Sequence, residues 1–510
     1  MKNPKLLPIL LVLLLAKTIT YAQPESFYHE FPVQFNDSVE MAFQQNSFQI
    51  SDSTYLSTGN RGINFYGLAG RVIWDSAGNV LDAKYLDVDE SFYLNGLTRI
   101  DSNRFLLYGQ FDLYHDSTGS LIDHTAAMVC FNKNGDVIWQ KAYGGYAPGF
   151  PDIEAPWYDY DDSFLDVKID SLNERIYAIG GSNAFNVEHE YKPYVVCTNY
   201  NGDTIWTWTM PDMPNHNGGS ISGATITTES DLMLVGQMPR HGPGKASYTK
   251  GLVLKLSGEG NMEWYKLWGD DWIPNTYDIV ETNENEYVFG GIYTVTEPDT
   301  LLYGVDVGVL KKIDDSGNFL SEKHITRDTN DIIRIYKMIK KEYGFAVIGS
   351  FRINDIDNFY VNKYTNDLNI ISEKNYVIEN NPYGTFGIRG ISETYDGGYL
   401  YTGYGGDQTN MVMKSDGEFN FPLSEGWQAI YVPNTKTEIR FYPNPATKIL
   451  YVKSTGNKPL EDIKIYDMYG RIVMEQYCDN AYCQINVGHI KSGLYVLRVN
   501  KLYSGKLIIK

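Results

Sequence analysis

The sequence predicts an all-β chain in which a repeated body is followed by a small separate domain. Aromatic residues make up 14% of the chain, with 41 tyrosines among 510 residues, and 47 glycines are available for turns. This balance favours pleated strands over helices. A strand that ends in glycine recurs along the body, and short alternating runs separated by turn residues fill the chain from Phe441 onward.

The first residues have the features of a secretory signal peptide, predicted to span residues 1–22. Lys2 and Lys5 precede an apolar run at residues 6–16, and Ala22 ends a cleavage site with small residues at its first and last positions. The run is too short for a transmembrane helix, and no cysteine follows it that could carry a lipid anchor. We therefore expect cleavage after Ala22 and passage through the periplasm.

The body, residues 23–432, is expected to be a seven-bladed β-propeller. Each repeat supplies about four strands in roughly 55 residues, which suits one propeller blade. In the sixth repeat, Leu368 replaces the glycine of a hairpin turn. Residues 27–43 should pair into the last blade, because an open ring would leave two unpaired edges. The repeat glycines are Gly59, Gly109, Gly180, Gly236, Gly290, Gly349 and Gly403.

Segments of the repeat such as residues 134–145 and 392–403 resemble secreted bacterial propeller repeats. This resemblance implies a fold but no activity. Cys130 and Cys197 occupy equivalent places in neighbouring repeats and are expected to be buried free thiols. Packing between blades is the predicted role of three tryptophans that follow a turn glycine by four residues. They are Trp139, Trp206 and Trp264.

The connections between hairpins are longer and more variable than the turns inside them, and they should emerge on one rim, where a ligand would be met. In the longest connection, residues 144–163, aromatic rings could stack on sugar faces while carboxylates bind hydroxyl groups or Ca²⁺. A solvated loop folded on itself is the alternative. The candidate ligand-binding residues are Trp157, Tyr158, Asp159, Tyr160, Asp161 and Asp162.

Metal and nucleic-acid sites are not predicted. Five histidines fall in the connections, but no two of them show the spacing of a known metal site. The formal net charge of the chain is −20, and the negative charge lies in the body, because the signal peptide and the C-terminal block are both net positive. Such a body would repel phosphate backbones. Apart from possible Ca²⁺, no cofactor is expected. The five histidines are His115, His124, His189, His216 and His241.

Local motifs of catalysis are absent from the sequence, including Gly-x-Ser-x-Gly, His-Glu-x-x-His, the phosphate loop and the dinucleotide fingerprint. We therefore predict no catalytic residue and a non-enzymatic body. Propeller enzymes gather side chains from different blades, so a polysaccharide-degrading hydrolase or lyase remains the alternative.

The C-terminal block carries four ordered motifs, at residues 441–446, 465–471, 492–499 and 506–510. Its alternating runs predict a small immunoglobulin-like β-sandwich spanning residues 433–510. Cys478 and Cys483 flank a short turn in this domain. The sequence allows either a disulfide between them or two free thiols.

The block resembles the C-terminal sorting domain of the type IX secretion system of Bacteroidota. The resemblance implies that the secretion machinery and its sortase are partners, and that the body is released or attached to the outer cell surface. The sorting-motif residues are Tyr442, Pro443, Asn444, Pro445, Asp467, Gly470, Gly493, Tyr495 and Lys510. The whole chain is then predicted to be an exported, monomeric module that binds or adheres to an extracellular glycan or protein.

Overall fold

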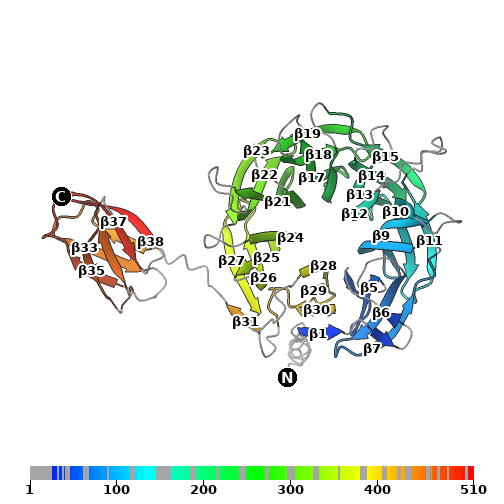
Figure 1. Cartoon of the computed structure of the whole chain (residues 1–510), viewed down its shortest axis with the longest axis horizontal. Coiled ribbons are helices and arrows are strands. Elements are labelled where there is room, and N and C mark those ends of the chain that lie inside the picture. Colours follow the sequence, from blue (N-terminus) through cyan, green and yellow to red (C-terminus); the bar gives the residue numbers. More distant parts are fainter. Residues whose placement is uncertain are drawn as a thin grey trace, which may run out of the picture. The chain divides into compact units, whose positions relative to one another are not determined.

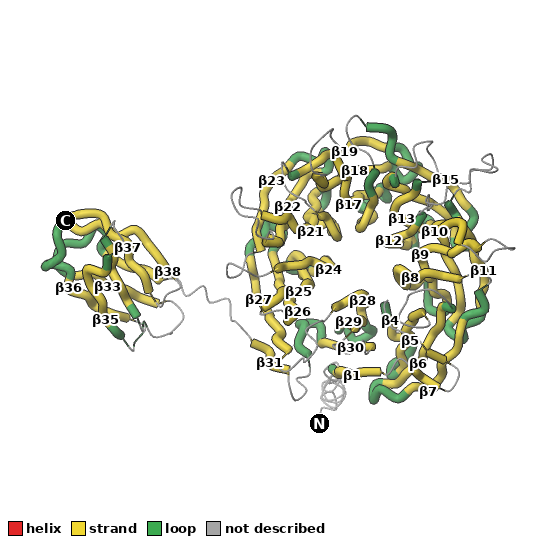
Figure 2. Tube along the Cα trace, in the orientation of Figure 1, coloured by secondary structure: helices red, strands yellow, loops and turns green. Residues whose placement is uncertain are grey.

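The computed structural model divides the chain into two compact units, Met1–Tyr431 and Val432–Lys510. The described residues form strands, turns and loops, and they contain no helix (Figure 2). Among these residues there is accordingly no helix long and apolar enough to cross a membrane. The structure describes residues 26–31, 34–36, 39–40, 46–60, 68–88, 91–114, 121–144, 162–183, 191–213, 218–240, 248–269, 275–295, 305–325, 332–353, 356–378, 387–404, 410–421, 427–430, 439–454, 460, 462–467, 471–478, 480, 482–499 and 503–510. The predicted signal peptide and cleavage site lie outside these ranges.

In its described residues, the first unit consists mainly of antiparallel sheets that we number in chain order. Sheet 1 contains β4 (Ser47–Gln49), β5 (Thr54–Asn60), β6 (Ala69–Asp75) and β7 (Val80–Tyr85). Sheet 2 contains β8 (Ser91–Arg99), β9 (Arg104–Tyr114), β10 (Leu121–Asn132) and β11 (Val137–Ala142). Sheet 3 contains β12 (Ser163–Asp170), β13 (Arg175–Ser182), β14 (Lys192–Asn199) and β15 (Thr204–Thr209). Sheet 4 contains β16 (Ser220–Ile226), β17 (Leu232–Arg240), β18 (Tyr248–Leu256) and β19 (Met262–Trp268).

The remaining sheets of this unit follow the same plan, with one extra strand in sheet 6. Sheet 5 contains β20 (Asn275–Asn283), β21 (Glu286–Val295), β22 (Val305–Asp314) and β23 (Phe319–Ile325). Sheet 6 contains β24 (Ile332–Lys341), β25 (Gly344–Ile353), β26 (Ile356–Tyr364), β27 (Ile370–Ile378) and β31 (Trp427–Ile430). Sheet 7 contains β28 (Gly387–Glu393), β29 (Tyr399–Tyr404), β30 (Asn410–Ser415) and β1 (Phe27–Phe31), and a separate hairpin joins β2 (Gln34–Asn36) to β3 (Val39–Glu40).

The sheets succeed one another around a ring, with the first strand of each sheet toward the centre (Figure 1). The ring is closed by β1, which pairs with β30 from Phe27 opposite Lys414 to Phe31 opposite Asn410. The expected pairing of residues 27–43 is therefore confirmed for Phe27–Phe31, whereas β2 and β3 pair with each other instead.

Most of the repeat glycines are explained by a bulge in the strand that they face. Sheet 1 is different, because β4 pairs with β5 without a bulge in the described register. One residue of the first strand is left unpaired near the glycine, for example Leu165 between Phe164 and Asp166 opposite Gly180. A Cβ atom at Gly180 would lie 1.9 Å from the backbone oxygen of Ser163, so only glycine fits. The same clash, at 1.9 to 2.0 Å from a backbone oxygen, arises at Gly109, Gly236, Gly349 and Gly403. In sheet 5 the equivalent residue is Gly291, one position after the predicted Gly290.

The turn after the third strand of each of sheets 1 to 7 needs one residue with positive φ. Glycine fills this position in sheets 1 to 5, for example Gly135 with φ of 78°. In sheets 6 and 7, Leu368 (φ 61°) and Phe419 (φ 63°) occupy it instead. Both side chains are buried, and this burial offsets the cost of about 1–2 kcal/mol for a left-handed residue with a side chain. The hairpin of the sixth repeat therefore forms without its glycine.

The repeated tryptophans pack between neighbouring sheets, as predicted. Each indole N–H donates to a backbone carbonyl in the corresponding turn of the next sheet, at 2.8 to 3.1 Å. Each ring also lies against the glycine of that turn. The pairs are Trp139 with Gly202, Trp206 with Gly260, and Trp264 with Gly317.

The second unit contains two sheets around one core, which includes Leu450, Ile465, Leu497 and Leu507. One sheet contains β32 (Ile439–Tyr442), β33 (Ile449–Ser454) and β36 (Tyr482–Asn486). The other contains β35 (Ile472–Gln476), β34 (Ile463–Tyr466), β37 (Gly493–Val499) and β38 (Tyr503–Ile509), in this order. Along β37 the burial alternates between exposed and buried, as expected for a strand with one face on a core.

Candidate functional site

The predicted ligand-binding connection is described only at its two ends. Trp157, Tyr158, Asp159, Tyr160 and Asp161 lie outside the described residues. Asp162 is 1% exposed, and its carboxylate accepts the backbone N–H of Asn183 at 3.1 Å. Asp162 therefore holds two chain segments together, and its role in ligand binding stays a prediction.

Of the five histidines assigned to connections, only His124 is described. It lies within strand β10 and is buried, so its assignment to a connection is corrected. Across the described ranges, no three His, Cys, Asp or Glu side chains gather closely enough to hold a metal ion.

The first and last motifs of the C-terminal unit meet at Asn444. Its side-chain amide donates to the carbonyl of Lys506, and its side-chain oxygen accepts the N–H of Ile508, both at 2.8 Å. Ala446 then pairs with the same strand end, because its N–H donates to Ile508 and its carbonyl accepts the N–H of Lys510, again at 2.8 Å. Motifs that are more than sixty residues apart in the sequence thus form one structural element.

The peptide bonds Tyr442-Pro443 and Asn444-Pro445 are both cis. Strand β32 ends at Tyr442, and the Asn444 side chain that follows it contacts the edge of β38.

The two central motifs stabilise turns within the unit. Asp467 accepts the backbone N–H of Arg471 at 3.0 Å and pairs with its guanidinium. The hydroxyl of Tyr495 donates to the carbonyl of Lys491 at 2.7 Å, and its ring covers Gly493. Gly470 lies outside the described residues.

An exposed row of tyrosines crosses the three-stranded sheet of this unit and was missed by the sequence analysis. The ring centroids of Tyr442 and Tyr451 are 5.7 Å apart, and those of Tyr451 and Tyr482 are 5.8 Å apart. Tyr442 of β32 lies directly opposite Tyr451 of β33, and Tyr482 of β36 lies diagonally across from Tyr451. The sequence pattern that corresponds to this row is one tyrosine in each of three strands that are neighbours in the sheet. It can be recognised only once the register of these strands is known.

Cys478 and Cys483 form a disulfide with a Cα separation of 6.2 Å. The flanking strands β35 and β36 belong to different sheets, so the bridge lies where the chain crosses between sheets and not across a hairpin as expected. Cys130 and Cys197 are buried free thiols, and burial raises the pKa of each to about 12.

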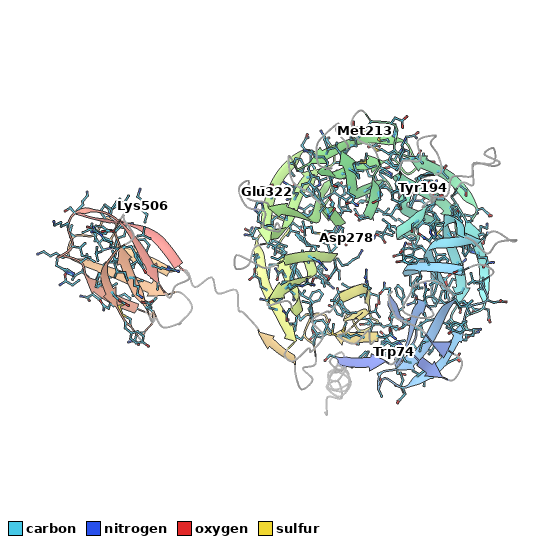
Figure 3. All side chains as sticks on the ribbon, in the orientation of Figure 1. Trp74, Tyr194, Met213, Asp278, Glu322 and Lys506 are labelled. Atoms are coloured by element: carbon cyan, nitrogen blue, oxygen red, sulfur yellow. A yellow bond between two sulfur atoms is a disulfide. The ribbon has the colours of Figure 1, made fainter. Side chains whose placement is uncertain are left out.

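A cluster of charged side chains lies on the inner strands of the first unit. Lys337 of β24 pairs with Asp278 of β20 at 3.2 Å, and Lys168 pairs with Asp166 of β12 at 2.8 Å. Asp278 is 3% exposed and also accepts the backbone N–H of Met338 at 2.8 Å. Figure 3 shows Asp278 on the inner side of the ring.

The charges of this cluster stabilise one another. Burial alone would raise the pKa of Asp166, but the nearby ammonium groups of Lys168 and Lys337 outweigh it and hold that pKa below its usual value. Burial would likewise lower the pKa of Lys337, but Asp278 and Asp166 together raise it. Asp166 and Lys337 are therefore both charged at neutral pH.

The charges follow from the same bulges that explain the repeat glycines. Asp166, Asp278 and Lys337 each come directly after an unpaired residue of an inner strand. In the other bulged inner strands this position is Gly96, Gly223 or Gly390. A β-bulge re-aims the side chain that follows it, which directs these charges toward one another. Aligned repeats would show one column that holds only glycine or a charged residue, which is the signal that sequence analysis missed.

Replacing Lys337 by methionine is expected to lower the free energy of unfolding by about 1 to 3 kcal/mol at pH 7. It leaves the Asp278 carboxylate buried without its cation, and the partial exposure of Lys337 keeps the loss below that of a fully buried pair. Because Asp166 has a lowered pKa, its stabilisation is present above its unfolded pKa of about 4 and is lost as the pH falls through the lower folded value. The deficit, measured by denaturant unfolding, should therefore shrink below about pH 4.

The control is Lys340→Met on the same strand, where the ammonium is largely exposed and 3.7 Å from Glu281. This variant should change stability by no more than about 0.5 kcal/mol. Equal deficits in the two variants, or a Lys337→Met deficit that ignores pH, would contradict a stabilising role for the inner cluster.

Comparison with known proteins identifies the second unit. Residues 440–510 match the family described as "Secretion system C-terminal sorting domain". They are a type IX secretion sorting domain, which directs export and attachment to or release from the outer cell surface. No curated protein matches the chain.

Several solved structures are similar to the chain at low identity. PorZ, an essential bacterial surface component of the type IX secretion system of Porphyromonas gingivalis, shares 11% identity with a TM-score of 0.37, over 94% of this chain and 61% of PorZ. Prolyl oligopeptidase B from Galerina marginata shares 9% identity with a TM-score of 0.41, over 86% of this chain and 57% of that one. The polysaccharide lyase Uly1 shares 9% identity with a TM-score of 0.43, over 79% of this chain and 96% of the lyase. The chain thus spans about three fifths of the first two, and none of these activities is assigned to it.

Proposed function

We propose that the exported body is a seven-bladed β-propeller that binds an extracellular glycan or protein. The sorting domain places the body outside the cell, where a rigid ring of sheets can hold binding loops in position. Each of sheets 1 to 7 corresponds to one blade in this proposal, with β1 as the last strand of the seventh.

The observation that carries the proposal is the difference between the two ends of the sheets. Because neighbouring strands are antiparallel, the tight turns that precede the second strand of each sheet and follow its third strand share one end. Most connections at the other end hold more residues, and the longest of them joins β11 to β12 through residues 143–162, although only two residues join β25 to β26. Length variation is therefore greatest on one rim, as is typical of a binding face on a fixed scaffold.

Binding by this connection is tested on the purified chain with a glycan array followed by calorimetry. Trp157→Ala and Tyr160→Ala should each weaken glycan binding by about 1 to 3 kcal/mol, by analogy with aromatic stacking on planar ligands. If a cation mediates binding, Asp159→Asn, Asp161→Asn and addition of a chelator should have the same effect. Failure of the chain to bind any glycan or extracellular protein would refute the binding function itself.

A further inference from the structure

The four-stranded sheet of the sorting domain carries a group of apolar side chains on its outer face. Leu494 and Val496 of β37 are each 38% exposed, whereas their neighbours Tyr495 and Leu497 are buried in the core. Ile472 of β35 is 50% exposed. Residues that alternate in this way along a strand point to opposite faces of the sheet. We use the name apolar patch for the outward residues Tyr466, Ile472, Leu494, Val496 and Ile508, which are exposed or partly exposed.

The register of the strands brings the residues of the apolar patch together. Tyr466 lies opposite Ile472 on one side and opposite Val496 on the other. Leu494 lies opposite Ile508 and shares one face of its strand with Val496. Directly opposed side chains of antiparallel strands are close enough to interact. The apolar patch is therefore one continuous surface built by β34, β35, β37 and β38, and exposed surfaces of this kind mark sites where proteins meet.

Three of the four sorting motifs contribute to the apolar patch. Tyr466 comes from the motif at residues 465–471. Leu494 and Val496 come from the motif at residues 492–499, and Ile508 comes from the last motif. A sorting signal can be recognised only through residues at the surface. The outward apolar residues of the motifs lie off the core, so recognition explains their presence better than folding does.

The row of tyrosines on the other sheet is the competing surface of this domain. Tyr442 belongs to the motif at residues 441–446, but Tyr451 and Tyr482 lie outside all four motifs. Recognition through the row would therefore draw on one motif, whereas the apolar patch draws on three.

Positive charges border the apolar patch. Lys464 and Arg498 lie opposite each other on β34 and β37, and Lys506 lies opposite Val496. Residues 439–510 contain eleven lysine and arginine residues against five aspartate and glutamate residues, a net charge of +6, in a chain whose overall charge is −20. Complementary charge guides the encounter of two proteins and fixes their register. The partner that fits this face combines aliphatic side chains with surrounding carboxylates.

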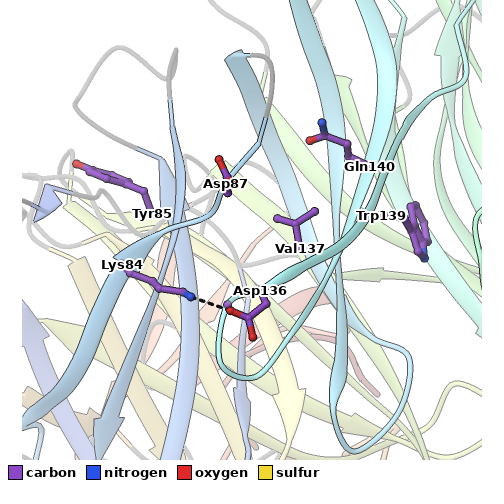
Figure 4. A pocket seen from close by; sticks show the side chains of 8 residues that line it. Lys84, Tyr85, Asp87, Asp136, Val137, Trp139 and Gln140 are labelled. Carbon is purple, nitrogen blue, oxygen red and sulfur yellow. Dashed lines mark hydrogen bonds and ion pairs between the residues drawn. The ribbon is translucent and has the colours of Figure 1, made fainter.

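The described surface of the body has a different character. Its groove of about 540 Å³ between β7 and β11 has Lys84, Asp87, Asp136 and Gln140 in its lining, and Lys84 pairs with Asp136 at 3.2 Å (Figure 4). Polar side chains of this kind are satisfied by water and by one another and do not require a partner.

We propose that the apolar patch is the face on which the sorting domain docks to a component of the type IX secretion machinery, through a partner surface that is aliphatic and acidic. This inference concerns the export of the chain, so it does not depend on what the body binds.

The first test is site-specific photocrosslinking of the full chain in cells that export it. Benzoylphenylalanine is placed at Ile472 of the apolar patch, or at Tyr482 as the matched control, because the two residues are 50% and 48% exposed on different sheets. Position 472 should give about tenfold more crosslink to a secretion component, identified by mass spectrometry, than position 482, as expected for a contact at the centre of an interface.

The second test measures the surface level of the chain by cell fractionation. Leu494→Asp combined with Val496→Asp should lower it about tenfold, because two carboxylates replace apolar contacts and repel an acidic partner. Tyr451→Asp combined with Tyr482→Asp makes the same change on the other sheet and should be exported normally. Leu494→Thr combined with Val496→Thr keeps the β-propensity of the strand and should also lower export, with a sorting domain that still resists protease.

Several results would overturn the assignment. They are normal export of the Leu494→Asp, Val496→Asp chain or of its threonine counterpart, and equal losses in the variants of the two sheets. Crosslinks from position 472 only to a second copy of this chain would assign the apolar patch to self-association instead. Crosslinks to a secretion component from position 482 and not from position 472 would move the docking face to the row of tyrosines.

Discussion

Removal of residues 441–510 is expected to leave the body folded but retained in the periplasm, with its amount at the cell surface reduced to background. The sorting domain is a separate compact unit with its own core, so its loss exposes no core of the body. Cell fractionation with immunodetection measures the effect, and protease resistance of the retained protein reports whether the body is folded.

Two further variants make this test sharper. Asn444→Ala removes both side-chain hydrogen bonds to the last strand, worth about 0.5 to 1.5 kcal/mol each, and should lower export without preventing expression. Tyr477→Ser, at a residue 73% exposed and outside the four motifs, is the control and should be exported normally. Normal surface levels of the truncated chain would contradict the role of the sorting domain in export.

Phe27→Ala is expected to destabilise the body by about 3 to 5 kcal/mol, the largest effect of any single substitution considered. Phe27 belongs to the strand that closes the ring, and its buried ring packs edge-on against Tyr55 and Trp74 of sheet 1, with centroids 5.3 and 5.5 Å away. The substitution therefore loosens sheet 7 and its contact with sheet 1 together. Denaturant unfolding, followed by tryptophan fluorescence, measures the loss.

The control for this prediction is Leu172→Ala. Leu172 is 88% exposed in the turn between β12 and β13, so its truncation should change stability by less than about 0.5 kcal/mol. An unfolding midpoint for Phe27→Ala that equals that of Leu172→Ala would mean that β1 contributes little to ring closure.

Much of the order of the strands could be predicted, because the same pattern of glycines, turn residues and tryptophans recurs along the sequence. The clash at Gly180 and its equivalents in sheets 2 to 7 involves the backbone, so it requires glycine at the same place in each of these sheets. The turn residues and the tryptophans likewise contact only the adjacent sheet, and such contacts recur at a regular interval. Local and repeated causes of this kind are readable from one sequence.

The inner charge cluster could not be predicted from the sequence, because it does not depend on a local or repeated pattern. Asp166, Asp278 and Lys337 come from three different sheets and meet only because the ring closes. The repeat also departs from its pattern at Asp82 of sheet 1, where the repeated tryptophan is missing. The hydrogen bond between the Asp162 carboxylate and the backbone N–H of Asn183 joins two segments that are separated in the sequence, and no local pattern indicates it.

The contact between Asn444 and the end of strand β38 makes the proline-rich motif sensitive to proteolysis at a distant place. The edge that Asn444 and Ala446 complete is built from residues 506–510. A protease that removes these residues takes away the hydrogen-bond partners of Asn444 and Ala446, although it leaves the motif at residues 441–446 intact. Trimming of this strand should therefore weaken the sorting domain in the same way as a substitution of Asn444 itself.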